Sequence, residues 1–297
     1  MHYQDTIAKS LTSAWLILKF VIPIYLLADV LYYYDLLRHV AFVLEPVTRW
    51  VGLPAEAALA LISGMFLNLY ASIAFAAPLD MSPQQWTVLA VFLGVAHSLV
   101  VESAVMKHLG VAAWYAYGLR IVVAVAAGVA VSMLPEGVLS QQTIGEHAVD
   151  MERFANVWAM LEHSFWGAVV LALKIIVLIT VLIMFMEWIK ALPILQRSAQ
   201  HVSKGFTLAS GLILGITYGA GVLISEARSG HMSRMEIFVI ATFLLICHAI
   251  IEDTLLFVML GASGWVIVVA RSFAAIVVTW IAWVWVSKKV GKQRTEG

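Results

Sequence analysis

The chain has 297 residues, of which 62% are hydrophobic and only 12% are charged. A soluble domain carries about twice that share of charged residues, because surface charge keeps it dispersed in water. The net charge is zero, with 18 basic and 18 acidic residues, which excludes the basic excess expected of a nucleic-acid-binding protein. The composition therefore indicates an integral protein of the lipid bilayer that has no nucleic-acid partner.

Eight stretches of the chain approach the roughly 20 apolar residues that a spanning helix needs. They lie near residues 13–34, 56–78, 86–109, 112–134, 165–188, 206–227, 236–260 and 264–287. The polar N-terminus shows no cleavage site, so the first stretch is predicted to be a retained helix. Two stretches of mixed polarity, near 36–52 and 189–204, are predicted to be interfacial helices. We expect an all-α integral membrane fold.

A polar, mostly acidic connection, residues 135–164, divides the chain into a first membrane repeat, 1–134, and a second, 165–297, which ends in a basic tail. A shift of 151 positions aligns the repeats without gaps and gives 17 identities over residues 61–124. Polar residues match at this offset, namely His97 with His248 and Arg120 with Arg271; Lys19 and Lys174 match once four residues are allowed between the halves. Shared apolar composition does not explain these matches, so the sequence predicts an internal duplication.

Basic residues favour the cytoplasmic side of a membrane and can therefore orient the halves. If all eight stretches cross, eight of the fourteen basic residues outside the spans lie inside. If 56–78 and 206–227 are instead re-entrant hairpins, eleven lie inside and the acidic segment 135–164 lies outside. Each half then crosses three times, so the repeats are inverted. We expect this second arrangement, with both termini cytoplasmic in a bacterial-type inner membrane.

The two predicted hairpins each have a break near the middle, at residues 64–68 and at 215–221. Interrupted segments at matching positions in two halves point to a transporter binding site. The alternative for the second segment is a straight spanning helix with a packing face of small residues spaced by four, namely Gly211, Gly215 and Gly219.

Each half also carries a polar cluster deep within an apolar stretch. The clusters contain an imidazole, carboxylates and a hydroxyl: His97, Glu102 and Ser103 in the first half, and His248, Glu252, Asp253 and Thr254 in the second. An ionised side chain at mid-bilayer costs roughly 2.5–3.5 kcal/mol on insertion scales, so these groups should face the interior of the bundle. We expect them to form the central substrate or ion site, with Asn68, Tyr218 and the hairpin backbone contacting the solute.

If the helices are continuous, the spacing along the chain decides which of these side chains share a helix face. His248 and Glu252, four residues apart, would share a face. His97 and Glu102 would diverge by about 140°, which argues against a tight pair within one helix. Glu102 is therefore expected to meet another helix, through Arg120, Arg271 or the opposite cluster.

Two interpretations of the clusters remain open. Imidazole with carboxylate can bind a proton, a sodium ion or a divalent metal, and the candidate metal ligands are His97, His248, Glu102 and Asp253. The clusters can also be buried ion pairs, in which Arg120 and Arg271 neutralise the carboxylates or act in gating.

The segment 215–221, Gly-Ile-Thr-Tyr-Gly-Ala-Gly, and the segment 247–257, Cys-His-Ala-Ile-Ile-Glu-Asp-Thr-Leu-Leu-Phe, followed by Gly261, resemble the nucleoside recognition, or Gate-domain, membrane proteins. Related repeats occur in bacterial ferrous-iron permeases, sporulation maturation proteins and concentrative nucleoside transporters. Residues 64–68 and 97–103 give a weaker version, so the resemblance covers about 50–130 and 200–285. It implies paired, inverted Gate units that line a substrate route, and by analogy a homodimer.

The chain departs from these relatives in two ways. Ferrous-iron permeases carry a cysteine in their Gate motifs, whereas here Leu67 precedes Asn68 and Cys247 is the only cysteine. The chain carries no GTPase domain and lacks the acidic hairpin signature of a nucleoside transporter. Neither GTP-gated iron transport nor a nucleoside substrate is therefore expected.

The sequence shows no Ser-centred nucleophile motif, no phosphate-cradling Gly-Lys-Ser/Thr loop and no His-Glu-x-x-His motif. It therefore predicts a transporter rather than an enzyme, with no cofactor except a bound cation. The expected function is secondary transport of a small solute or ion, driven by a proton or cation gradient. The alternatives are a passive divalent-metal permeation protein and a non-transporting membrane partner whose buried ion pairs are structural.

Overall fold

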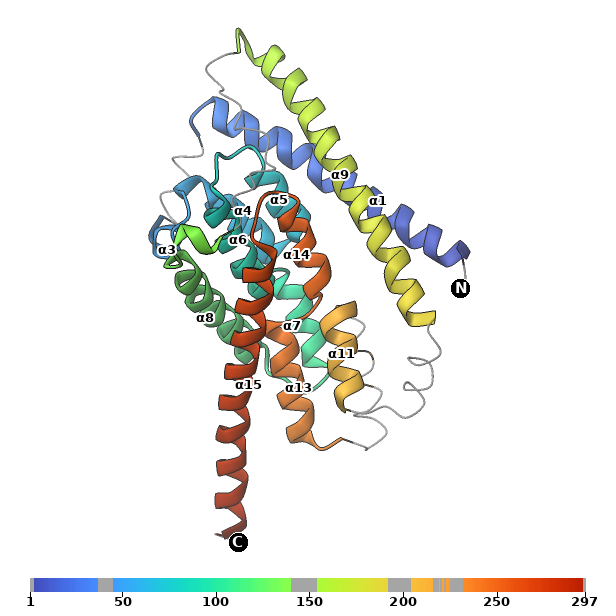
Figure 1. The fold of residues 1–297 in the computed structure, drawn as a ribbon, viewed down its shortest axis with the longest axis vertical. Coiled ribbons are helices and arrows are strands. Elements are labelled where there is room, and N and C mark those ends of the chain that lie inside the picture. Colours follow the sequence, from blue (N-terminus) through green and yellow to red (C-terminus); the bar gives the residue numbers. More distant parts are fainter. Residues whose placement is uncertain are drawn as a thin grey trace.

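A computed structural model describes residues 3–36, 45–139, 154–191, 204–215 and 232–295, together with residues 219, 221, 223 and 224. The described part of the chain is all-helical (Figure 1). Its helices are α1 (Tyr3–Tyr33), α3 (Glu45–Trp50), η1 (Ala55–Ala57), α4 (Ala58–Phe66), α5 (Leu69–Ala76), α6 (Pro83–Ala96), α7 (Leu99–Lys107), α8 (Ala113–Ser132), η2 (Glu136–Val138), α9 (Val157–Ala191), α11 (Lys204–Leu214), α13 (Arg234–Ile246), α14 (Ile250–Val258) and α15 (Gly264–Thr295).

Six helical segments of the described chain are long and apolar enough to cross a membrane. They are Gln4–Tyr33, Pro83–Lys107, Ala113–Ser132, Val157–Ile189, Arg234–Val258 and Gly264–Lys288. Three lie in each predicted half, and the stretch near 56–78 forms two short helices instead of a span. The predicted all-helical membrane fold is therefore confirmed.

One boundary differs from the sequence expectation. Helix α9 begins at Val157, within the segment assigned to the connection, because Asn156 caps it by accepting a hydrogen bond from the Ala159 amide at 3.0 Å. Helix α3 lies in the first predicted interfacial stretch, 36–52, of which residues 37–44 lie outside the described residues; most of the second stretch, 189–204, lies outside them too.

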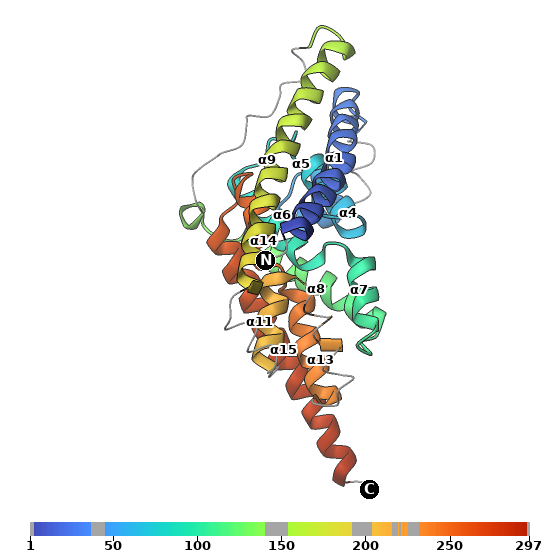
Figure 2. The same cartoon turned by 90° about the vertical axis from the view of Figure 1, so that its right-hand side faces the viewer.

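The long helices α1 and α9 lie side by side along one flank of the molecule (Figures 1 and 2). They run antiparallel, because the ammonium of Lys9, near the start of α1, pairs with Glu187, near the end of α9, at 2.8 Å. Near the other end of α1, Asp29 accepts a side-chain hydrogen bond from Ser164 in the first turns of α9. Helices α1 and α9 are therefore tied together near both ends of α1 and run in opposite directions.

The offset of 151 also aligns Met81-Ser82 with Met232-Ser233, and both pairs lie at helix starts. Ser82 accepts a hydrogen bond from the Gln85 amide at 3.2 Å, and the Gln85 side chain accepts one from the Ser82 amide at 2.9 Å. Ser233 and Glu236 form the same reciprocal capping box at the start of α13. Such boxes satisfy amides that a helix start leaves free, so this part of the repeat is explained by local structure.

The first predicted hairpin consists of α4 and α5, which pack against each other. Asn68 separates them in an extended conformation, and its side-chain oxygen accepts a hydrogen bond from the Ala71 amide at 2.9 Å. A Cβ on Gly64 would lie 3.0 Å from the Cβ of Ser72, eight positions later. In one straight helix these positions would be about 12 Å apart, so the chain reverses at Asn68.

The second segment reverses in the same way. A Cβ on Gly219 would collide with the Cα of Gly211, which a straight helix forbids. Gly215 lies between them with φ of +90°, a left-handed conformation that glycine adopts at no steric cost. The alternative interpretation of the spaced glycines as one packing face on a straight helix is therefore wrong.

These contacts also correct the alignment of the hairpins. The Gly64 carbonyl accepts a hydrogen bond from the Ser98 amide at 2.9 Å, and the Gly211 carbonyl accepts one from the Ala249 amide at 3.5 Å. The offset of 151 aligns Ser98 with Ala249 and Gly64 with Gly215. Since Ser98 and Ala249 bond to Gly64 and Gly211, Gly64 corresponds to Gly211 instead. The ungapped alignment was displaced by about one helical turn here, because the second half has four more residues between its hairpin and its core helix.

The close approach at Gly219 gives a direct test of the second reversal. We expect Gly219→Ala to lower the thermal unfolding temperature of the detergent-purified protein, because its methyl group would meet the backbone of Gly211. Gly221→Ala is the matched control, since a Cβ there meets nothing within 4 Å. Equal unfolding temperatures for the two variants would contradict the reversal.

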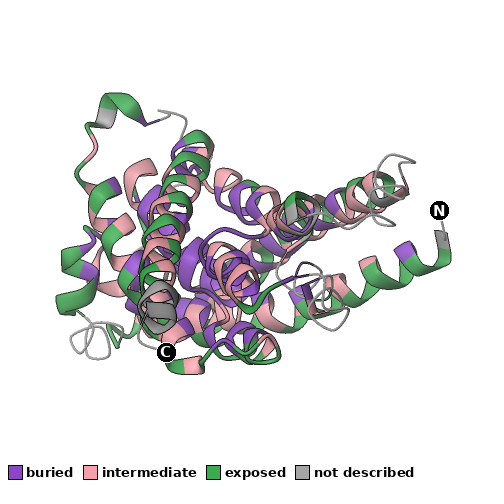
Figure 3. Ribbon diagram, turned by 90° about the horizontal axis from the view of Figure 1, so that it is seen from below, coloured by how far each residue is buried: buried purple, intermediate pink, exposed green. Residues whose placement is uncertain are grey.

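Burial is concentrated in the middle of the bundle (Figure 3). In the span Pro83–Lys107, 72% of the apolar window is buried, compared with 28% for the α1 and α9 windows and 22% for the α15 window. The span made by α6 and α7 is therefore the central one, and polar groups placed on it are kept away from lipid.

Candidate functional site

The two most buried spans, Pro83–Lys107 and Arg234–Val258, are both broken near their middle. Helix α6 ends at Ala96 and α7 starts at Leu99, with Ser98 in the left-handed region at φ of 45°. Helix α13 ends at Ile246 and α14 starts at Ile250, with Ala249 at φ of 46°. Non-glycine residues in this conformation cost of order 1–3 kcal/mol and are found mainly where the surrounding structure and function require them. Broken helices within a membrane protein frequently line an ion or substrate site.

The breaks overturn two geometric expectations from the sequence. His97 and Glu102 were expected to diverge on one continuous helix, but the turn at Ser98 brings them together, with His97 Nε2 and Glu102 Oε1 3.0 Å apart. The expected shared face of His248 and Glu252 is also lost, because the chain leaves helical geometry at Cys247–Ala249.

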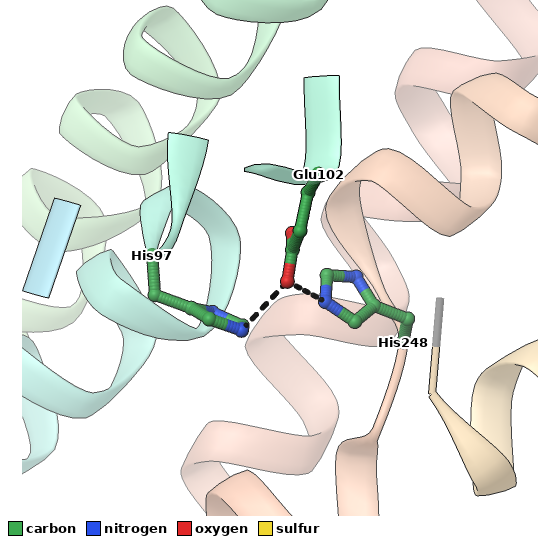
Figure 4. Close-up of side chains that lie close together, drawn as sticks. All are labelled: His97, Glu102 and His248. Carbon is green, nitrogen blue, oxygen red and sulfur yellow. Dashed lines mark hydrogen bonds and ion pairs between the residues drawn. The ribbon is translucent and has the colours of Figure 1, made fainter. Parts of the chain in front are cut away.

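Glu102 lies at the centre of the resulting cluster (Figure 4). Its Oε1 atom is 3.0 Å from Nε2 of His97 in its own half and 3.1 Å from Nε2 of His248 in the other half. Its second oxygen, Oε2, is 2.7 Å from Nη2 of Arg120. Glu102, His97 and His248 are at most 7% exposed. One carboxylate therefore links the two halves in the buried centre of the molecule.

The backbone fixes the orientation of both imidazoles. Nδ1 of His97 lies 2.8 Å from the Leu93 carbonyl, and Nδ1 of His248 lies 2.7 Å from the Leu244 carbonyl. A carbonyl can only accept, so each Nδ1 must carry its proton and donate it. The two Nε2 atoms consequently face Glu102, and the ring centroids of the two histidines are 5.2 Å apart.

Two buried arginines satisfy the carbonyls that the helix breaks leave free. Arg120 donates from Nε to the Val95 carbonyl and from Nη2 to the His97 carbonyl, both at 2.6 Å. Arg271 donates from Nη2 to the His248 carbonyl at 2.8 Å and from Nη1 to Asp253 Oδ2 at 2.9 Å. Each arginine is thus both an ion-pair partner and a cap for the end of the preceding helix.

The other residues predicted for the site fall in several places. Glu252 lies apart from the histidine cluster and accepts a hydrogen bond from the Tyr70 hydroxyl at 3.4 Å. Asp253 pairs with Arg271. Ser103 and Thr254 are buried, and their hydroxyls have no hydrogen-bond partner within the described chain.

Of the two hairpin side chains predicted to contact the solute, only that of Asn68 is described. The Asn68 side chain caps α5, and Tyr218 lies outside the described residues. The hairpin backbone, however, contacts the break directly, because Ser98 donates to the Gly64 carbonyl from its amide and to the Leu67 carbonyl from its hydroxyl at 3.2 Å. The first hairpin and the site therefore share hydrogen bonds.

Two polar residues were missed in the sequence. Tyr70 of α5 reaches across to Glu252, and no spacing rule connects residues so distant in the chain. Asp29 is 1% exposed at the contact between α1 and α9. A carboxylate inside an apolar stretch was the signal that could have identified Asp29.

Residues 14–112 match the Gate family, which is described as nucleoside recognition. Over this range the chain is similar to the Gate domain. The resemblance predicted from the sequence is thereby confirmed, although the match lies in the first half, where the motif was judged weaker, and extends back into α1.

The Gate domain match includes the first hairpin and the break that carries His97 and Glu102. Over 302 aligned residues, covering 97% of each chain, the protein is 28% identical to YvoD of Bacillus subtilis (strain 168), described as an uncharacterized membrane protein. No solved structure gives a significant match. The six candidate spans and this relative identify an integral membrane protein, and the Gate match favours a transport-related role over an enzymatic one.

Proposed function

We propose that this protein is a cation-coupled secondary transporter of a small solute or ion, with its ion site between two inverted repeats. The observation that carries the proposal is the position of Glu102, which contacts one histidine from each half where two spanning helices are broken. A carboxylate shared between two halves can respond to an ion by changing how the halves fit together. The ion then controls which side of the site opens.

Several features support the inversion of the repeats. Three candidate spans lie in each half, and an odd number of crossings reverses the second half relative to the first. The counterparts α1 and α9 run antiparallel, as the Lys9–Glu187 pair requires. Inverted repeats with broken helices at the membrane midplane are a recurring transporter architecture. The basic-residue distribution favours cytoplasmic termini in an inner membrane of bacterial type.

The coupling step follows from the chemistry of Glu102. With both histidines neutral, the two Nε2 lone pairs and the carboxylate oxygen repel one another, so the halves separate at this point. A proton or a metal cation between them converts the repulsion into attraction. Binding therefore favours the closed arrangement of the structure, and release favours a more open one, which is the requirement for alternating access.

Thermal stability of the detergent-purified protein is the first test. The panel consists of Na⁺, Zn²⁺, Mn²⁺, uridine and a pH series, applied to the wild type and to Glu102→Gln. A ligand that binds the native state raises the unfolding temperature, by an amount set by its affinity. We expect at least one ligand to raise the unfolding temperature of the wild type and not that of Glu102→Gln. The same ligand should be taken up by proteoliposomes that contain the wild type and not by those that contain Glu102→Gln. Stabilisation of both proteins alike, with no flux, would contradict the proposal.

A second candidate is a non-transporting membrane partner protein with structural ion pairs. The buried pair of Arg271 with Asp253, 2.9 Å apart, favours it, since Arg271 also caps a helix break at the His248 carbonyl and no contact of the pair with either imidazole ring is seen in the described part of the chain. If this second function is correct, variants at the cluster lose stability. Their flux does not change, because the wild type itself shows no flux. The proteoliposome measurement therefore separates the two functions.

A further inference from the structure

Three side chains converge on one point in the cluster. Nε2 of His97, Nε2 of His248 and a carboxylate oxygen of Glu102 all lie within 4.8 Å of one another. Three ligands bound at about 2.0–2.1 Å in tetrahedral geometry would be roughly 3.4 Å apart. The two nitrogen–oxygen distances, 3.0 and 3.1 Å, are close to that spacing. The three atoms can therefore reach one small cation with little movement.

The protonation of the imidazoles supports a cation between the three atoms. Each Nδ1 donates to a main-chain carbonyl, so a neutral ring presents an Nε2 lone pair to Glu102. Metal-bound histidines are commonly held in this way, with the other ring nitrogen donating to a carbonyl that fixes the tautomer. Here the Leu93 and Leu244 carbonyls accept these hydrogen bonds and fix the tautomers. The second Glu102 oxygen is held by Arg120, which fixes the carboxylate.

We propose that His97, His248 and Glu102 bind one divalent first-row transition metal ion, of the class of Zn²⁺ and Co²⁺, with a fourth position open for water or solute. Two imidazoles and one carboxylate suit these ions, whereas Mg²⁺ and Ca²⁺ prefer oxygen ligands throughout. Asp253, a candidate ligand from the sequence, is not among the three side chains whose ligand atoms converge on this point. The inference rests on the proposed function and names its cation.

Co²⁺ is the probe, because four-coordinate Co²⁺ absorbs visible light in a way that reports nitrogen and oxygen ligands. Full-length detergent-purified protein is loaded with Co²⁺, desalted, and measured for metal per chain and for absorption. We expect one tightly held Co²⁺ per wild-type chain, displaced by Zn²⁺. Binding should weaken as the pH falls, because protons compete for the two Nε2 atoms.

The variants are His97→Gln, His248→Gln and Glu102→Gln, with His108→Gln as the matched control. His108 makes the same Nδ1 contact with a carbonyl four residues earlier, at 3.0 Å from Ala104, but it is exposed and outside the cluster. We expect the first three variants to lose the bound Co²⁺ and the visible band, and the control to keep both. If a cluster variant does not fold, the amount of Co²⁺ bound per wild-type chain and its visible absorption test the metal site without that variant.

Absence of a tightly held Co²⁺ in the wild type, or equal loss in His108→Gln, would overturn the metal site. Flux in proteoliposomes is measured separately on the same proteins. Metal binding without flux would leave the site in place and refute transport. Flux that depends on Glu102, without metal binding, would refute the metal site and assign protons to the cluster.

Discussion

Glu102→Gln is expected to abolish transport and to destabilise the protein by about 3 kcal/mol. The substitution removes the charge that faces Arg120 at 2.7 Å and leaves a fully buried guanidinium without its carboxylate, which is a costly change in a low-dielectric interior. It also removes the anionic oxygen that both histidines contact. Denaturant unfolding in detergent measures the first effect, and proteoliposome flux measures the second.

Glu102→Asp separates these two effects. At the matching position in the other half, Asp253 reaches its own arginine at 2.9 Å, so an aspartate at 102 should keep the pair with Arg120. The side chain is one methylene shorter and should no longer reach both histidines. We expect stability near that of the wild type, with flux and metal binding reduced at least tenfold. Normal flux in Glu102→Asp would show that the bridge between the histidines is not needed.

Gly94→Ala is expected to cost about 3 kcal/mol of stability, although it adds a single methyl group. A Cβ at Gly94 would lie 2.8 Å from both Cδ and Nε of Arg271, whose side chain passes over α6 at this point. The guanidinium would be pushed away from Asp253 and from the His248 carbonyl, which leaves a buried charge and a helix end unsatisfied. Unfolding in detergent should show the loss directly.

Gly118→Ala is the control for this prediction. Gly118 lies inside α8, and a Cβ there meets nothing within 4 Å. Alanine has a higher helix propensity than glycine, by about 1 kcal/mol, so this variant should be neutral or slightly stabilised. A loss of stability in Gly118→Ala similar to that in Gly94→Ala would mean that the Arg271 contact is not the cause.

Large parts of the fold could be predicted from the sequence because the patterns that indicate them extend over many residues. Spanning helices follow from the length of apolar stretches, and the Gate resemblance followed from motif residues such as the 247–257 segment. The His and Arg residues that match at one offset also indicated which polar groups belong to the candidate site. The structure brings His97, Glu102, His248 and Arg120 together, while their roles in transport stay predictions.

The helix breaks could not be predicted in the same way. Ser98 and Ala249 adopt positive φ, yet neither is glycine or proline, so no local signal marks them. Their conformation is held by tertiary contacts: the Gly64 and Gly211 carbonyls accept from their amides, and the arginines cap the preceding turns. The pairing of His97 with Glu102 depends on this turn, which is why helical geometry alone gave the wrong answer.

The correspondence between Glu102 and Asp253 has a consequence for the symmetry of the molecule. Both carboxylates sit at the same place in their repeats and both pair with the arginine of that repeat, but only the longer side chain bridges the histidines. A duplicated and inverted scaffold with two equal bridges would look the same from either side of the membrane. In the inverted arrangement that we propose, the one additional carbon atom of Glu102 gives the first half alone a bridge, and this bridge distinguishes the two faces of the protein.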